Sequence, residues 1–170
     1  MKKLMLFAAA AVFSLSSVNA QEVNFGAKAG VDLASAKAEF DGFSASTSET
    51  GFYVGAFAEI GISDEFSVQP EVLYVSIKDL GQIHVPIMAK YGVSDEINLL
   101  AGPTVSFLTD TAEGVKSMNY GIEAGASYDI TEEILVEARY NIGLANLYED
   151  APDGASFKLS GFYIGLGYRF

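Results

Sequence analysis

The stretch at residues 161–170, GFYIGLGYRF, alternates strictly between two kinds of side chain and decides the fold. One face of an extended strand would carry only large apolar or aromatic groups: Phe162, Ile164, Leu166, Tyr168 and Phe170. The other face would carry glycines, Tyr163 and Arg169, because successive side chains of a strand point to opposite faces. In a water-soluble protein such a terminal strand would be an aggregation-prone edge. The alternation therefore indicates that a medium other than water covers the apolar face.

The first twenty residues have the layout of a secretory signal peptide. Two lysines precede an apolar run from Leu4 to Leu15, and small and polar residues close the segment at Ala20. The apolar run is too short for a comfortable transmembrane helix. We therefore predict that residues 1–20 are cleaved and that residues 21–170 form one mature domain.

The predicted mature segment is acidic and contains no cysteine. Loss of Lys2 and Lys3 changes the formal net charge from −12 to −14. This charge disfavours nucleic acid, because phosphate binding needs a basic surface. One histidine and no cysteine give no metal-ligand spacing, and the glycines of 161–167 lie at strand spacing rather than in a dinucleotide fingerprint. The sequence thus predicts no metal and no cofactor.

Short and long connections alternate along the chain. Three short acidic turns repeat, each between two segments of alternating pattern, which is typical of hairpins: GISDEF (61–66), GVSDEI (92–97) and DITEEI (129–134). Longer polar stretches, predicted to be loops, lie at 35–49, 78–81, 109–117 and 148–157. This pattern predicts eight strands, at roughly 23–34, 50–62, 66–77, 80–93, 97–108, 118–130, 134–147 and 158–170.

Each predicted strand has an uncharged apolar face and a second face of glycines, polar groups and isolated charges. The second faces carry both signs of charge: Lys28, Asp32, Glu59, Glu71, His84, Lys90, Glu123, Glu137, Arg139 and Arg169. A soluble sheet would carry many more charges on its wet face. A narrow lumen fits better, because buried charges must pair. We therefore predict an all-β protein: an eight-stranded antiparallel up-and-down transmembrane β-barrel with lipid against its apolar face.

Several of these features resemble small bacterial outer-membrane β-barrels: the signal peptide, the eight segments, the short acidic turns and the terminal YRF (168–170). The stretch QIHVPIMAKYGV (82–93) is similar to the Pro–apolar–apolar–Lys–Tyr strand of the PorT-like outer-membrane barrels of Bacteroidetes. The resemblance implies a place in the bacterial outer membrane. It also implies that the barrel assembly machinery reads the final strand, with Phe162, Tyr168 and Phe170 as the assembly signal.

The lumen of an eight-stranded barrel is just filled by its own side chains. On this register five large side chains point inward and would obstruct a pore: Phe57, Leu73, Met88, Leu100 and Arg139. We therefore predict a non-porin, non-enzymatic barrel with an envelope structural or interaction role, whose loops 35–49, 109–117 and 148–157 could meet an extracellular partner. A narrow channel or small-ligand-binding barrel is the alternative, and a soluble secreted barrel is a weaker one.

A further alternative is a lipid-modifying hydrolase. The predicted hairpins bring Glu71, His84 and Ser106 in or near one row, and an acid, a histidine and a serine form the composition of a hydrolytic triad. No nucleophile-elbow sequence accompanies them, and a lone histidine in a packed lumen is more often a hydrogen-bonding partner.

Three prolines fit the barrel poorly. Pro70, Pro86 and Pro103 fall near one height on three adjacent predicted strands. Proline has no N–H to donate to the ladder, and a closed barrel has no edge on which to place it. We predict bulges or a weakened row of pairing there.

Overall fold

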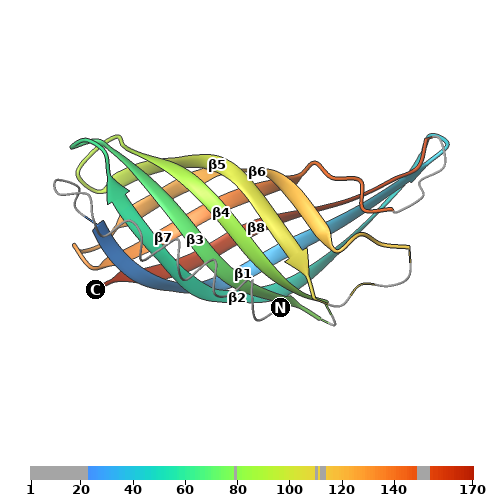
Figure 1. Cartoon of the computed structure of the whole chain (residues 1–170), viewed down its shortest axis with the longest axis horizontal. Helices are drawn as coiled ribbons and strands as arrows, with labels where there is room; N and C mark the ends of the chain where they lie inside the picture. The colour runs from blue at the N-terminus through green and yellow to red at the C-terminus, as the bar shows by residue number, and fades with distance from the viewer. Residues whose placement is uncertain (1–22, 79, 110, 112–113, 149–153) are drawn as a thin grey trace.

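The computed structural model describes residues 23–78, 80–109, 111, 114–148 and 154–170, so the predicted signal peptide at 1–20 lies outside the described residues. Its strands are β1 (Val23–Phe40), β2 (Phe43–Gly61), β3 (Phe66–Ile77), β4 (Leu80–Gly92), β5 (Ile97–Leu108), β6 (Met118–Asp129), β7 (Ile134–Gly143) and β8 (Ser156–Arg169). They form a closed antiparallel barrel in sequential order, sealed by β8 against β1 (Figure 1). The predicted barrel is confirmed. No helix in the described part of the chain is long and apolar enough to cross a membrane.

Alternation along each strand separates an apolar outer surface from a polar lumen. The outward positions expose large apolar groups on every strand, among them Phe25, Val54, Tyr74, Ile87, Leu99, Ile122, Tyr140 and Leu166. The charged side chains of the intervening positions are buried inside, with Lys90 5% exposed and Glu123 and Arg139 0% exposed. In water this surface would form an exposed apolar patch far larger in area than those of monomeric soluble proteins. Hydrocarbon is the medium that suits it.

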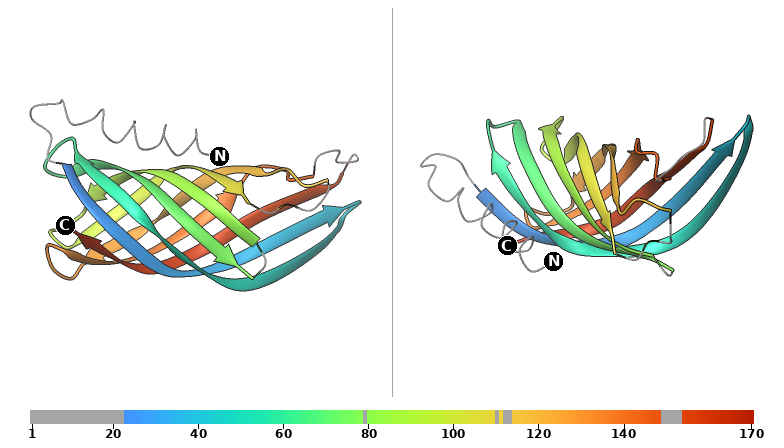
Figure 2. Two further views of the ribbon diagram at one scale, coloured as in Figure 1. Left: turned by 60° about the horizontal axis from the view of Figure 1, so that its bottom comes forward. Right: turned by 45° about the vertical axis from the view of Figure 1, so that its right-hand side comes forward.

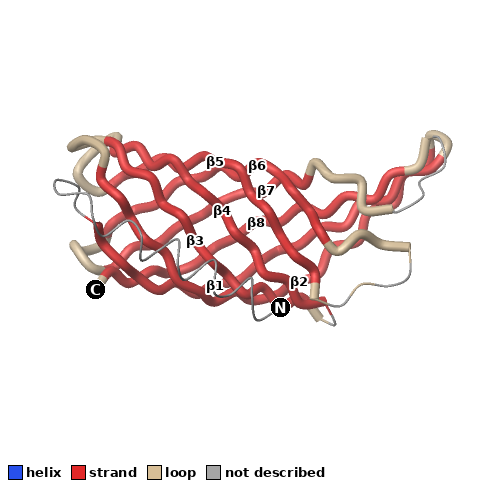
Figure 3. The backbone as a smooth tube through the Cα atoms, in the orientation of Figure 1, coloured by secondary structure: helices blue, strands red, loops and turns tan. Residues whose placement is uncertain are grey.

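The three short acidic turns cluster at one end of the barrel, and the other connections between strands lie at the opposite end (Figure 3). We call these the turn end and the loop end. In the turn after β4, Ser94 Oγ accepts hydrogen bonds from the backbone N–H groups of Glu96 and Ile97. Thr131 repeats the arrangement before β7. A hydroxyl that accepts from N–H groups two and three residues ahead explains why Ser or Thr recurs in these turns.

The stretch 35–49, predicted to be a loop, is instead strand. β1 and β2 stay paired as far as Phe40 and Phe43, and β8 pairs with β1 out to Glu39. These three strands continue past the ends of the others (Figures 1 and 2). We call residues 35–49, the part of this extension that β1 and β2 form, the arm. Asp41 and Gly42 join β1 to β2 with φ of 46° and 80°. Positive φ at both central residues is the geometry that a two-residue Asp-Gly hairpin turn adopts.

The predicted bounds around β7 and β8 also need correction. β7 ends at Gly143 rather than at 147, because the N–H groups of Leu144 and Ala145 both point to the Tyr120 carbonyl oxygen. Two residues opposing one form a bulge, which ends the ladder. β8 begins at Ser156, inside the predicted loop 148–157, because its first residues pair with the arm.

Pairing is interrupted at the three prolines, without bulges. The β2–β3 ladder lacks the pair opposite Pro70, the β3–β4 ladder the pair opposite Pro86, and the β4–β5 ladder the pair opposite Pro103. The register is the same on both sides of each gap, so no residue is inserted. Of the two alternatives in the prediction, the structure shows the weakened row and not bulges. The missing N–H of each proline accounts for the gap.

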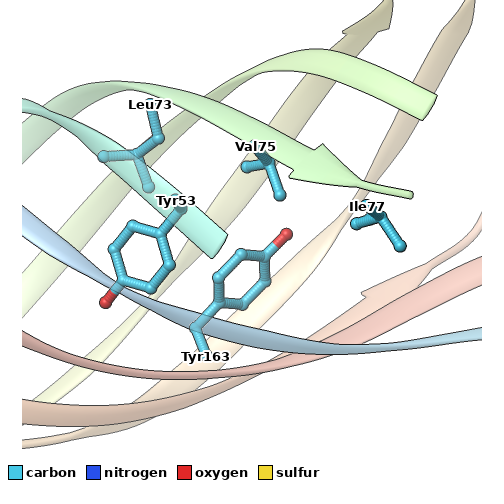
Figure 4. Close-up of a cluster of buried hydrophobic side chains, with 5 residues drawn as sticks. All are labelled: Tyr53, Leu73, Val75, Ile77 and Tyr163. Atoms are coloured by element: carbon cyan, nitrogen blue, oxygen red, sulfur yellow. The ribbon is translucent and has the colours of Figure 1, made fainter. Parts of the chain in front are cut away.

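Apolar side chains fill part of the lumen toward the loop end. Leu73, Val75 and Ile77 of β3 form one buried cluster with Tyr53 and Tyr163 (Figure 4). The two rings meet edge to face with centroids 5.5 Å apart, a favourable geometry for aromatic pairs. All five side chains expected to obstruct the lumen are buried: Phe57, Leu73, Met88, Leu100 and Arg139.

Candidate functional site

Five charged side chains meet in the lumen, and we call them the central ion cluster: Lys28, Glu71, Glu123, Glu137 and Arg139. Lys28 Nζ donates to Glu71 Oε1 at 3.0 Å and to Glu137 Oε2 at 2.8 Å. Arg139 Nη1 donates to Glu71 Oε1 at 3.0 Å. The same guanidinium lies 3.0 Å from Glu123 Oε1 and 3.1 Å from Glu137 Oε1. All five side chains are fully buried, so each charge depends on its partners to offset desolvation.

Uncharged groups on β2 and β3 complete the central ion cluster. The Tyr53 hydroxyl donates to Glu137 Oε1 at 3.0 Å, and Gln69 Nε2 donates to Glu71 Oε1 at 2.7 Å. Tyr53 can cross the lumen because a glycine faces it: a Cβ at Gly165 would lie 2.1 Å from the Tyr53 hydroxyl oxygen. The glycines of the luminal faces thus leave the space that long polar side chains occupy.

A second charged group lies near the turn end. Lys90 Nζ donates to both carboxylate oxygens of Glu59 at 2.9 Å. Arg169 Nη2 donates to Asp129 Oδ1 at 2.7 Å, and its Nε lies 3.4 Å from Glu59 Oε2. Asn98 Nδ2 also donates to Asp129. Glu59, Asp129 and Arg169 are partly exposed, so solvent screens this group more than the central ion cluster.

His84 contacts Ser106 but not Glu71. Its Nδ1 lies 2.7 Å from Ser106 Oγ, and its Nε2 lies 2.9 Å from Glu123 Oε2. The predicted grouping of Glu71, His84 and Ser106 was therefore wrong about the acidic residue. Glu71 is bonded to Lys28 and Arg139. Glu123 instead reaches His84 from across the lumen. The imidazole also stacks on the Tyr163 ring, with centroids 5.4 Å apart.

Asp32 is buried in the lumen, 1% exposed, and forms no salt bridge within the described residues. Its Oδ1 has no hydrogen-bond partner there. Each of the other predicted luminal acids has a cationic or imidazole nitrogen at 3.0 Å or closer. Asp32 is thus the predicted network residue that the structure leaves outside the ion pairs.

The lumen opens at the loop end into a cavity of about 440 Å³, which we call the vestibule. Its polar lining residues include Asp32, Gln82, Ser106, Asn119, Asn141 and Tyr163, and the exposed Lys78–Glu49 ion pair also lines it. Its apolar lining includes Ala34, Ala36, Ile77, Leu80, Leu108 and Leu159. The volume falls in the range of small-molecule pockets, and apolar walls with a few polar groups are typical of them.

Of the three predicted assembly residues, Tyr168 and Phe170 lie side by side and Phe162 lies apart from them. Phe162 is half-buried and pairs with Leu33 on β1 and Tyr140 on β7. Tyr168 points outward near the turn end, and its ring lies 5.8 Å from that of Phe170. Phe170 is 80% exposed and is held through its backbone, whose N–H donates to the Phe25 carbonyl oxygen at 2.9 Å.

Several uncharged luminal groups were not among the residues predicted to form the luminal network. Tyr53, Gln69 and Asn141 bond to members of the central ion cluster, and Asn141 also donates to Thr104. Each lies an even number of residues from a predicted charged residue of the same strand, and therefore on the same face, as Asn141 does from Arg139. Their position on the same strand face as the charged residues was therefore the signal that could have predicted their place in the network.

Residues 5–170 match a family model described as the outer membrane protein beta-barrel domain. Among solved structures, the chain is similar to Ail, the attachment invasion locus protein of Yersinia pestis, solved in complex with the heparin analogue sucrose octasulfate: the TM-score is 0.53 and the identity 16%, over 88% of this chain and 99% of that chain. It is similar to Neisserial surface protein A with a TM-score of 0.55 and 19% identity, over 88% and 99%. At these identities the likeness shows the fold. No curated protein matches the chain.

Proposed function

Because the chain belongs to the outer membrane protein beta-barrel domain family, we propose that it serves the bacterial outer membrane as a non-porin barrel, with a closed lumen and an interaction surface outside the cell. The membrane location follows from the family. The closed lumen and the surface role are the proposal. The observation that carries it is the filling of the lumen.

Every strand contributes a buried side chain to that filling. None of the eight is more than 3% exposed: Lys28, Tyr53, Glu71, His84, Leu100, Glu123, Arg139 and Tyr163. Ion pairs join β1 to β3 and β7, and β7 to β3 and β6. A hydrated ion would have to break several buried salt bridges to pass, and breaking even one is costly. This supports a plug rather than a pore.

Conductance in a planar bilayer tests the closed lumen. The folded wild-type barrel is expected to give no unitary current steps. The double variant Glu71→Ala/Arg139→Ala, which removes both partners of a cross-lumen pair, is expected to conduct small ions once heat-modifiable mobility on a gel shows that it has folded. Reproducible steps from the wild-type barrel would favour the narrow channel instead.

The arm supports the surface role. Barrels of this kind place short turns in the periplasm and long connections outside, so the arm would project from the cell. Its tip presents two aromatic side chains, with Phe40 59% and Phe43 82% exposed. Of the predicted contact loops, 35–49 is this arm, and residues 110, 112–113 and 149–153 of the other two lie outside the described residues.

A deletion strain tests the surface role. Loss of the protein is expected to alter surface contact or envelope integrity, and the wild-type gene should restore it. A gene carrying Phe40→Ser/Phe43→Ser should yield a folded barrel that restores integrity but not contact. Full restoration of contact by this variant would argue against the arm as the contact surface.

A non-enzymatic role is supported by the hydrogen bonds of His84. Both ring nitrogens are engaged inside the packed lumen, by Ser106 and Glu123. We propose that the imidazole links these groups structurally. The lipid profile of a Ser106→Ala strain is therefore expected to equal that of wild type, and an altered profile would count against this assignment.

Three finer assignments rest on the sequence. The strand at 82–93 supports a PorT-like subtype, the layout of residues 1–20 supports a cleaved signal peptide, and the aromatic final strand supports recognition by the barrel assembly machinery. Amino-terminal sequencing of protein from purified outer membranes tests the second, with Gln21 expected as the first residue.

A further inference from the structure

We propose that the vestibule binds a small organic amine, with the ammonium group on Asp32 and the apolar body against the vestibule walls. This site goes beyond the proposed structural role, and it does not depend on whether the barrel conducts. The argument rests on the isolation of Asp32, on its position and on the lining of the cavity.

The isolation of Asp32 is a matter of charge. The other luminal carboxylates of the described residues, Asp129 included, each lie 3.0 Å or closer to a basic nitrogen. The luminal cations are all engaged by those acids: Lys28, Lys90, Arg139 and Arg169. Asp32 therefore has no cationic partner among the described residues. A buried carboxylate without a partner is strongly destabilising, and a cationic ligand supplies the missing charge.

The position of Asp32 makes it accessible from the loop end. Asp32 lines the vestibule, while the central ion cluster does not. Gly161 on β8 leaves the space for its carboxylate, because a Cβ there would lie 2.5 Å from Asp32 Oδ1. A ligand in the vestibule would contact this carboxylate without entering the central ion cluster.

A second unpaired acceptor lies in the same cavity. Asn119 Oδ1 is buried and has no hydrogen-bond partner in the described part of the chain, and Asn119 lines the vestibule with Asp32. Both free atoms are oxygens, so a donor is the group that satisfies them. An ammonium has three N–H donors and a positive charge.

The vestibule walls select the rest of the ligand. Aliphatic side chains line the cavity between Asp32 and the loop end, including Ile77, Leu108 and Leu159. Burying apolar surface against them is favourable by roughly 25 cal/mol per Å². A strongly hydrated inorganic cation would gain nothing from these walls. An amine with a compact apolar body satisfies both the acceptors and the walls.

Calorimetric titration with benzylamine tests the site, using the folded barrel in lipid nanodiscs and benzyl alcohol as the uncharged probe of similar shape. Benzylamine is expected to bind at least tenfold more tightly than benzyl alcohol. Amide chemical-shift changes should map to the vestibule rather than to the turn end. Asp32→Asn should weaken benzylamine binding at least tenfold, while Asp41→Asn, the same change at the arm tip, should leave it unaltered.

Several results would overturn the proposal. These are no saturable benzylamine binding to the wild-type barrel, equal binding of the two probes, or equal benzylamine binding by folded Asp32→Asn. Asp32-dependent binding of K⁺ or Ca²⁺ that benzylamine cannot displace would assign the site to an inorganic cation and likewise reject an amine. Heat-modifiable mobility separates loss of binding from loss of fold, and the conductance measurement tests the closed lumen independently.

Discussion

Arg139 on β7 and Glu71 on β3 meet across the lumen, with Nη1 3.0 Å from Oε1 and both side chains fully buried. These strands are not neighbours in the sheet. The contact therefore ties together parts of the wall that no ladder joins. Lys28 adds the same kind of tie from β1 to β3 and β7. The stability of the barrel should depend on its filling as well as on its backbone hydrogen bonds.

Arg139→Met should destabilise the barrel severely. The substitution keeps an apolar stem but removes the cation that contacts all three carboxylates of the central ion cluster, leaving Lys28 to pair with two of them. Removing one partner of a buried ion pair costs about 3–5 kcal/mol. Urea unfolding of the protein refolded into lipid vesicles measures the loss. Lys78→Met, which breaks the exposed Lys78–Glu49 pair, should change little, and equal midpoints for the two variants would contradict the prediction.

Acid should loosen the arm through Glu39. The hydrogen bond from Lys37, the charge of Lys37 and the hydrogen bond from Ser156 lower the pKa of Glu39 below its ordinary value of 4.5. A lowered pKa means that the contribution of Glu39 is present above the ordinary pKa and disappears as pH falls through the lowered one. The protection factor of the Ser156 amide, which is its exchange rate corrected for the intrinsic pH dependence, should therefore fall in acid. Glu39→Gln should remove this pH dependence, and an unchanged profile in that variant would reject it.

Phe170→Ala should impair assembly without weakening the folded barrel. The ring is 80% exposed and its anchoring hydrogen bond comes from the backbone. The folded, heat-modifiable fraction in outer membranes should fall, while the urea midpoint of refolded protein stays the same. Phe43→Ala is the matched control, because Phe43 is equally exposed, at 82%, but lies at the arm tip. Equal folded fractions of the two variants in outer membranes would reject Phe170 as part of the assembly signal.

The row of prolines should form the weakest part of the wall. Pairing is interrupted opposite Pro70, Pro86 and Pro103, whereas β6 and β7 pair without a break from Gly121 to Asp129. Hydrogen exchange in nanodiscs should show faster amide exchange at 58–59, 71–72 and 87–88 than at 121–129. Uniform protection would mean that the gaps in the ladder do not lower local stability.

The barrel could be predicted because its two surfaces face such different media. A single residue of slip would move Arg139 into lipid and Tyr140 into the lumen, so alternation sets strand phase strongly. The arm could not be predicted in the same way. Neither of its faces needs to be uniformly apolar, and its small residues look like a loop. Asp41-Gly42 was the local signal for a hairpin there.

The ion pairs were harder to predict than the burial. Pairing two strands through their hairpin turn predicts only which residues are neighbours in the sheet. It correctly predicts that His84 lies opposite Ser106. Contacts across the lumen join strands that the ladder keeps apart, and they depend on side-chain length. This is why Glu123 rather than Glu71 reaches His84, and why the isolation of Asp32 was not visible in the sequence.

The unbroken run of β1 from the turn end to Phe40 constrains how the arm can vary in length. One extra residue in β1 beyond Ala34 would turn every later side chain of that strand to the opposite face while β2 and β8 kept their own phase. Insertions and deletions that preserve the ribbon must therefore be matched across the Asp41-Gly42 turn. Related chains should differ in reach by whole cross-strand pairs, with the lumen undisturbed.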